Sequence, residues 1–150
     1  MISNGFKVIG ISTRTTNEGG QSQSDLGNLW QKFYSENILH RIPDKVSDDV
    51  ISIYTDYKSD FTGEYTAIVG AQVTSLDHIP EGMNGREFDA EKFKKYTSKG
   101  PMPEAVVNTW IEIWQKDKQL NRKYSYDFEV YGAKSQNGDN SEVDIYISIF

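Results

Sequence analysis

The chain has 150 residues, contains no cysteine and carries a formal net charge of −6 at pH 7. Its length fits a single domain with a sizeable core, and the absence of cysteine excludes disulfides and thiolate metal sites. The negative charge disfavours nonspecific binding to nucleic acid and to anionic membranes, because both require clustered Lys and Arg.

The first predicted element is a strand over residues 6–16, FKVIGISTRTT, which is rich in β-branched side chains and follows Gly5. A helix is predicted over residues 21–38, where Ser24 or Asp25 can serve as the N-cap. Its apolar side chains recur at helical spacing and are Leu26, Leu29, Trp30, Phe33 and Ile38.

Two further strands are predicted in the first half, over residues 50–57 and 65–76, joined by the turn KSDFTGE. Within the first of them, Tyr54 alternates with Ile51 and Ile53. Tyr54 is therefore expected to face away from that apolar pair, because successive side chains of a strand point to opposite faces.

The stretch REFDAEKFKKYTSKG, residues 86–100, carries conflicting signals. Local propensity over DAEKFKK favours a helix. The tail KYTSK is typical of extended structure, and Gly100 followed by Pro101 ends it. We predict a strand here.

A second helix is predicted to begin at Pro101 and Pro103, where a missing backbone N–H costs little, and to run to about residue 118. Its apolar stripe consists of Val106, Val107, Trp110, Ile113 and Trp114. Strands are predicted over residues 123–132 and 142–150, separated by the polar turn AKSQNGDNS.

The predicted order is β-α-β-β followed by β-α-β-β, and the two halves look like copies. Aligning VISIYTDY with YSYDFEVY superimposes Tyr57 on Tyr131. One helix on three strands buries too little surface to be stable alone, so we expect both halves to pack as one pseudo-symmetric domain. The domain would span residues 1–150, with repeat one at about 5–76 and repeat two at about 86–149.

Glu129 raises the main functional question. It lies in the middle of the strand YSYDFEVYG, whose apolar alternate set is Tyr124, Tyr126, Phe128 and Val130. A carboxylate in the opposite set is either solvated on an outer face or held in a pocket for a partner. The alternation alone leaves both readings open.

The chain resembles the gyrase-inhibitor-like (GyrI-like) effector-binding domains, which also form the ligand-binding part of some AraC-type and multidrug-responsive transcription regulators. Three stretches carry the resemblance in order: YTDYKSDFTGEYTAIVG, TSKGPMPEAVVNTWIEIW and YDFEVYG. It covers about residues 5–149. No helix-turn-helix is expected before the domain, because the first predicted strand begins almost at Met1. We therefore expect a stand-alone form that does not bind nucleic acid directly.

The resemblance implies an α+β fold with a duplicated βαββ repeat and a pseudo-twofold axis. A curved antiparallel sheet and two helices would frame a central aromatic pocket. A Glu on the strand after the second helix faces ligands in that pocket, often cationic or amphipathic ones, and it matches Glu129. The pocket aromatics would fall on Trp30 and Tyr54 in the first half, and on Trp110 and Trp114 in the second.

Three tyrosine hydroxyls, those of Tyr54, Tyr131 and Tyr146, are candidates to hydrogen-bond a buried Glu129, which would otherwise be costly. Phe33, from the same helix as Trp30, is a further candidate ligand-binding side chain. Aromatic faces attract cations by about 0.5–2 kcal/mol per ring, so such a pocket favours a flat or amphipathic cation over an anion. The alternative is that the tryptophans at helical spacing are ordinary core residues.

The first functional hypothesis is a small-molecule-binding domain that senses or sequesters an aromatic, cationic or amphipathic ligand, with Glu129 as the charge anchor. The second is a hydrolase of strained electrophilic rings that uses Glu129 as general base, although no GxSxG, GxGxxG or P-loop motif is present. The third is a protein-interaction module of the gyrase-inhibitor type. The sequence does not separate binding from binding followed by hydrolysis.

No cofactor, metal or membrane partner is expected. The only two histidines, His40 and His78, lie far apart in sequence and lack a neighbouring ligand at metal spacing. The N-terminus has no basic segment followed by an apolar stretch of a signal peptide, and no apolar run approaches roughly 18 residues. We therefore expect a cytoplasmic protein.

Overall fold

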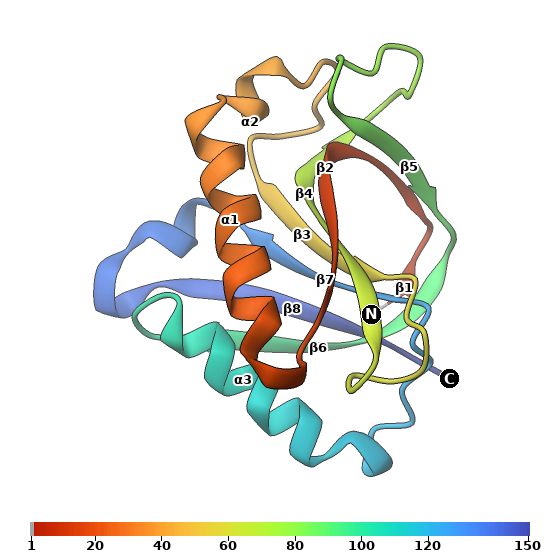
Figure 1. Ribbon diagram of the computed structural model, residues 1–150, viewed down its shortest axis with the longest axis vertical. Helices are drawn as coiled ribbons and strands as arrows, with labels where there is room; N and C mark the ends of the chain where they lie inside the picture. The colour runs from red at the N-terminus through yellow and green to blue at the C-terminus, as the bar shows by residue number, and fades with distance from the viewer. Residues whose placement is uncertain (1) are drawn as a thin grey trace.

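The computed structural model describes residues 2–150 and contains one antiparallel sheet with helices beside it (Figure 1). The strands are β1 (Ile2–Ser3), β2 (Phe6–Thr16), β3 (Val50–Thr55), β4 (Glu64–Val73), β5 (Asn84–Phe88), β6 (Glu91–Lys99), β7 (Tyr126–Tyr131) and β8 (Glu142–Ile149). The α-helices are α1 (Gln21–Ser35), α2 (Ile38–Arg41) and α3 (Glu104–Gln115). Short 3-10 turns lie in the connections. The predicted α+β class is confirmed.

The sheet has the strand order β1-β6-β8-β7-β3-β4-β2-β5, and its ladders are all antiparallel. Strands β3 and β7 pair at the middle, so one strand from each half of the chain meets there. On either side of this pair the order is mirrored, with β8 then β6 on one flank and β4 then β2 on the other. The centre of the sheet is thus also the seam between the two halves.

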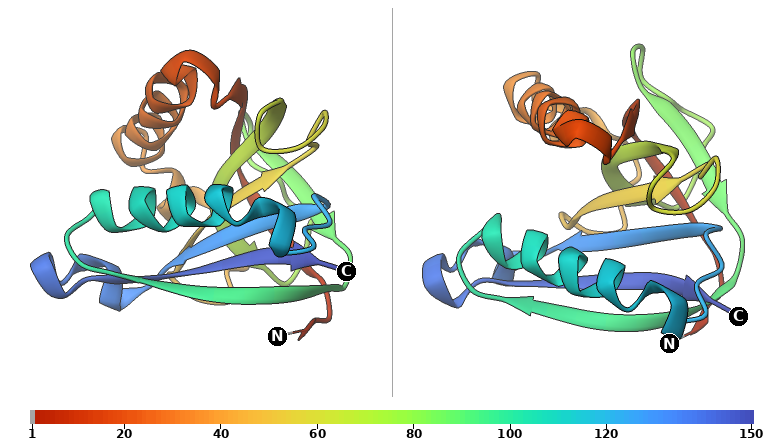
Figure 2. Two further views of the ribbon diagram at one scale, coloured as in Figure 1. Left: turned by 90° about the horizontal axis from the view of Figure 1, so that it is seen from below. Right: turned by 60° about the horizontal axis from the view of Figure 1, so that its bottom comes forward.

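Both long helices cover the same face of the sheet (Figure 2). One row of residues crosses that face from strand to strand and consists of Ile11, Val69, Ser52, Glu129, Ile145 and Tyr96. Phe33 of α1 packs into the cluster that contains Ile11, whereas Trp110 of α3 packs into the cluster that contains Ile145. Each helix covers one flank, and the middle of the row, where Glu129 lies, is between them.

The opposite face of the sheet curls on itself around an aromatic core. Phe6 of β2 contacts Phe128 of β7, with ring centroids 5.2 Å apart, although β4 and β3 separate those strands. Phe93 and Tyr146 join the same cluster from β6 and β8. We call this the packed face, because its rings lie against one another and all of those named here except Phe6 are buried.

Most predicted elements are confirmed, two differ substantially, and two short elements, β1 and α2, were not predicted. The single strand predicted over 86–100 is two strands, β5 and β6, because the chain turns between Phe88 and Glu91. The helix predicted over 21–38 ends at Ser35, since Asn37 adopts a left-handed conformation with φ of 52°. Within residues 2–150, the helices are too short and polar to cross a membrane.

Candidate functional site

The position of Glu129 follows from the alternation of strand β7. Phe128 and Val130 point to the packed face, whereas Asp127 and Glu129 point to the face that carries the helices. The Glu129 side chain is not solvated, because the residue is only 1% exposed. The structure thus resolves the sequence question in favour of a carboxylate held inside the protein.

Three aromatic side chains donate hydrogen bonds to the Glu129 carboxylate. The Tyr54 hydroxyl on β3 donates to Oε1 at 3.0 Å, and the Tyr131 hydroxyl on β7 donates to the same oxygen at 2.7 Å. The Trp110 indole N–H on α3 donates to Oε2 at 2.5 Å. Both carboxylate oxygens therefore have partners, which come from two strands and a helix.

Burial is the main influence on the pKa of the Glu129 carboxyl group. Desolvation raises the pKa of Glu129 above its ordinary value of 4.5, and the three donated hydrogen bonds lower it only in part. Burial also raises the pKa of Tyr54 and of Tyr131, and the nearby Glu129 charge adds to that effect. Both hydroxyls therefore remain protonated near neutral pH and keep their role as donors.

Glu129 borders a cavity of about 570 Å³ between α1 and α3. Trp30 and Leu26 of α1 line one wall, and Trp110 and Trp114 of α3 line the other. Its rim includes Val107, which is 47% exposed, so the cavity reaches the surface there. This volume lies within the range of about 300–1,000 Å³ that small-molecule pockets occupy.

The structure brings most of the predicted site residues to this cavity. Its lining includes the predicted Glu129 and five predicted aromatic side chains, namely Trp30, Tyr54, Trp110, Trp114 and Tyr131. Two of the predicted site residues, Phe33 and Tyr146, do not line this cavity. Phe33 is 1% exposed and packs against the sheet beneath α1, because it occupies the inward side of the helix stripe. Tyr146 pairs with Phe128 across β8 and β7, so its side chain lies on the packed face.

The lining residues that were not predicted include Tyr57, Phe61, Tyr65 and Arg122. Phe61, in the loop between β3 and β4, stacks on Trp114 with ring centroids 5.7 Å apart and an interplanar angle of 8°. Phe61 and Arg122 come from loops, where no periodicity indicates the direction of a side chain. Tyr65 lies on a predicted strand, and its pairing with Thr15 on β2 sets its side chain on the helix face.

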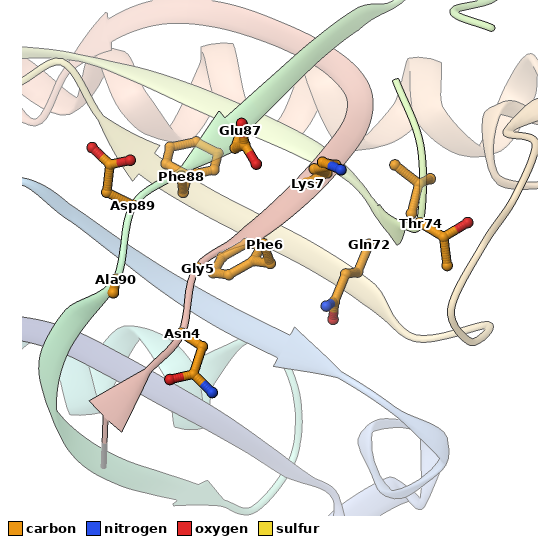
Figure 3. Close-up of a pocket in the computed structure, with 11 residues that line it drawn as sticks. Asn4, Gly5, Phe6, Lys7, Gln72, Thr74, Glu87, Phe88, Asp89 and Ala90 are labelled. Carbon is orange, nitrogen blue, oxygen red and sulfur yellow. The ribbon is translucent and has the colours of Figure 1, made fainter. Parts of the chain in front are cut away.

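A second, smaller hollow of about 350 Å³ lies at the β5 edge of the sheet, beside β2 (Figure 3). Its side-chain lining includes Lys7, Glu87 and Asp89, and both carboxylates belong to exposed residues. Solvated charges offer no special affinity for a ligand, so we assign the candidate site to the larger cavity. In the described part of the chain, no cluster of three His, Cys, Asp or Glu residues could hold a metal ion.

Residues 3–149 match the family described as integron-associated effector binding protein. A curated relative, the putative transcriptional regulator protein YobU of Bacillus subtilis, is 29% identical over 146 residues, which cover 95% of this chain and 91% of the relative.

Solved structures of other proteins share the fold. An integron cassette protein from the mobile metagenome of Vibrio cholerae is 32% identical and superimposes with a TM-score of 0.76, covering 100% of this chain and 95% of the other. The protein SAV2435, solved bound to tetraphenylphosphonium, is 17% identical with a TM-score of 0.82, covering 100% and 92%.

Proposed function

We propose that this chain, which belongs to the family of integron-associated effector-binding proteins, binds a hydrophobic or amphipathic organic cation in the cavity between α1 and α3. Family membership makes the chain a small-molecule effector-binding domain of the gyrase-inhibitor-like group. The nature of the ligand is our inference, and one observation carries it. A carboxylate that is 1% exposed lies in the wall of an aromatic cavity.

The electrostatic argument begins with the cost of burying a charge. An isolated carboxylate in an apolar site loses its hydration, and hydrogen bonds from neutral groups restore only part of it. Tyr54, Tyr131 and Trp110 supply three such bonds to Glu129, yet its pKa stays raised. A bound cation would supply the missing countercharge, so the site is expected to prefer cations strongly over neutral or anionic analogues.

The aromatic walls support the same ligand class. Trp30, Trp110 and Trp114 present large rings to the cavity, and each face attracts a nearby cation by about 0.5–2 kcal/mol. A flat or shielded cation buries apolar surface against these rings while its charge approaches Glu129. Tetraphenylphosphonium is a cation of this kind and is the ligand in the SAV2435 structure, so it is a suitable probe.

We also propose that the site arises from a duplicated βαββ unit, with copies at about residues 5–76 and 86–149 packed as one domain. The mirrored strand order around the β3–β7 pair supports this arrangement. So does the origin of the groups around Glu129, because Tyr54 belongs to one copy and Trp110 to the other. In this arrangement the ligand occupies the junction of the copies, and binding serves to sense or sequester it.

The decisive experiment is calorimetric titration of tetraphenylphosphonium into three proteins: wild type, Glu129→Gln and Glu87→Gln. Glu129→Gln removes the charge at nearly constant shape and is expected to weaken binding by about 2 kcal/mol, roughly 30-fold. Glu87→Gln is the matched control, since it removes a carboxylate from the smaller hollow (Figure 3). Equal weakening by both variants, or unchanged affinity of Glu129→Gln, would overturn the proposal.

A second candidate function is hydrolysis of a strained electrophilic ring, because the raised pKa of Glu129 beside two tyrosine hydroxyls also suits a general base and its partners. The residues are the same, so turnover is the discriminating measurement. Sustained product formation from an epoxide that Glu129→Gln abolishes would support the hydrolase. Saturable binding of the cation without turnover would favour the effector-binding role alone.

A further inference from the structure

The mouth of the cavity is bordered by a glycine on α1 and by apolar side chains on α3. Gly27, Val107 and Ile111 all line the cavity, and all three are exposed to solvent. Trp110 and Glu129 line the same cavity and are buried. The exposed lining residues therefore mark the place where the cavity opens, and the buried ones mark its floor.

Helical spacing places Gly27 on the side of α1 that borders the cavity. Gln23 lies four positions before it and Trp30 lies three positions after it, and both line the cavity. Residues at this spacing are neighbours on one face of a helix. Leu29 and Phe33, on another side of α1, are buried in the core over the sheet. A side chain at position 27 would therefore project at the cavity mouth, between two lining side chains.

Neither the backbone nor the packing requires a glycine at this position. Gly27 lies inside α1 and its φ is outside the left-handed region, so any L residue can adopt its conformation. A Cβ added to Gly27 would meet no atom within 4 Å beyond its own turn of helix. Glycine inside a helix is destabilising relative to alanine. The missing side chain thus costs helix stability and leaves free space at the mouth.

The α3 side of the mouth is apolar. Val107 and Ile111 are four positions apart, so their side chains are adjacent on the helix surface. Of the described residues that line the cavity, Glu129 and Arg122 carry the only charges, and both are buried. Covering exposed apolar side chains with an apolar group is favourable. The mouth therefore suits an apolar part of a ligand and offers no countercharge to a second ionic group.

We propose that Gly27 is a specificity-determining residue, whose missing side chain lets an apolar group of the ligand lie in the mouth against Val107 and Ile111. This inference rests on the proposed function, because it requires that Glu129 holds the cationic centre. The preferred ligand is then a bulky cation with apolar groups on all sides of its charge, rather than a cation with a charged or strongly polar tail. A side chain at position 27 occupies the space of the outermost group.

The test compares tetraphenylphosphonium with methyltriphenylphosphonium, in which a methyl group replaces one ring. Calorimetry measures both affinities in wild type, Gly27→Leu and Asn28→Leu. In Gly27→Leu, methyltriphenylphosphonium can turn its methyl group towards the added side chain, whereas tetraphenylphosphonium has a ring in every direction. The ratio of the two affinities, tetraphenylphosphonium over methyltriphenylphosphonium, is therefore expected to fall about tenfold, the scale of one partly buried ring.

Asn28→Leu is the matched control, because it adds the same side chain one position along α1, at an exposed residue outside the cavity lining. Its affinity ratio is expected to equal that of wild type. Gly27→Ala is a milder variant of the same position. It should raise the midpoint of thermal unfolding by about 3 °C through helix propensity. It should also lower the affinity ratio about twofold, a combination that a purely structural role of Gly27 would not give.

An affinity ratio that Gly27→Leu leaves unchanged, or that Asn28→Leu lowers equally, would refute the inference. If Gly27→Leu does not fold, Gly27→Ala decides in its place, and an unchanged ratio there has the same meaning. In each of these cases the weaker binding of tetraphenylphosphonium to Glu129→Gln would still support the proposed function. Failure of wild type to bind tetraphenylphosphonium, or equal affinity of Glu129→Gln, would instead refute the proposed function itself.

Discussion

Phe128 and Glu129 are neighbours on β7 and lie in two different aromatic environments. Phe128 contacts Phe6, Phe93 and Tyr146, with ring centroids 4.7–5.2 Å apart. Glu129 also lies among aromatic rings, but Tyr54, Tyr131 and Trp110 donate hydrogen bonds to its carboxylate. On the packed face the aromatic rings pack against one another. On the cavity face their O–H and N–H groups instead hydrogen-bond a carboxylate.

The difference has a geometric origin. The packed face closes because the sheet curls until β2 reaches β7, so its aromatic side chains fill the interior. The cavity face is covered by two separate helices, each seated on one flank, and the middle stays open. Aromatic content alone therefore does not identify a binding site, because both faces are rich in it. The buried carboxylate and its donors distinguish the two.

The largest expected effect is on the packed face. Phe128→Ala leaves a void among interlocked rings, so we expect the free energy of unfolding to fall by about 3–5 kcal/mol. Trp30→Ala removes a larger ring that borders the cavity and is only partly buried, and we expect a loss of about 1 kcal/mol. Urea unfolding measures both. Equal losses would mean that the cavity face is as tightly packed as the other.

A second expected effect is a pH dependence of cation affinity, which concerns only the cavity face. On the proposed function a cation binds the ionised form of Glu129, so its affinity should fall about tenfold per pH unit below the raised pKa of this group. Calorimetry in buffers of different ionisation enthalpy should show proton release on binding near that pKa. The profile of Glu129→Gln should be flat across the same range. A similar slope in the variant would assign the titration to another group.

The ionisation of Glu129 should also make the free energy of unfolding depend on pH. Because the pKa of Glu129 is raised in the folded state, folded protein binds more protons than unfolded protein between pH 4.5 and that raised pKa. Wild-type stability relative to Glu129→Gln should therefore fall as pH rises through this window. Thermal unfolding of both proteins at several pH values measures the difference. A difference that grows in the opposite direction would contradict a raised pKa.

The smallest expected effect separates the donors of the carboxylate. Tyr131→Phe removes one hydroxyl from Oε1 while Tyr54 still donates to it, so we expect a loss of about 0.5 kcal/mol in stability. The pKa of Glu129 should rise further, which shifts the pH profile of cation affinity upward. Tyr34→Phe is the control, because Tyr34 is 60% exposed. A profile unmoved by Tyr131→Phe would show that this bond does not stabilise the charge.

The sequence predicts well those features that depend on local periodicity. Alternation placed Tyr54 away from Ile51 and Ile53, and the structure confirms it. Tyr146 was misplaced because its face depends on how β8 pairs with β7, a long-range register that a single strand does not reveal. Phe33 was misplaced because helical spacing shows which residues share a stripe, but not which side of the stripe faces the sheet. Arg122 was missed because it lies in a loop.

The three tryptophans of the chain all line the cavity, and the indole N–H of Trp110 bonds the carboxylate itself. The tryptophan emission of the protein therefore originates entirely at the candidate site. An occupant of the cavity changes the surroundings of these rings, and a proton added to Glu129 changes those of Trp110. The protein thus carries its own optical reporter of occupancy, and a library of compounds can be screened against the unlabelled chain.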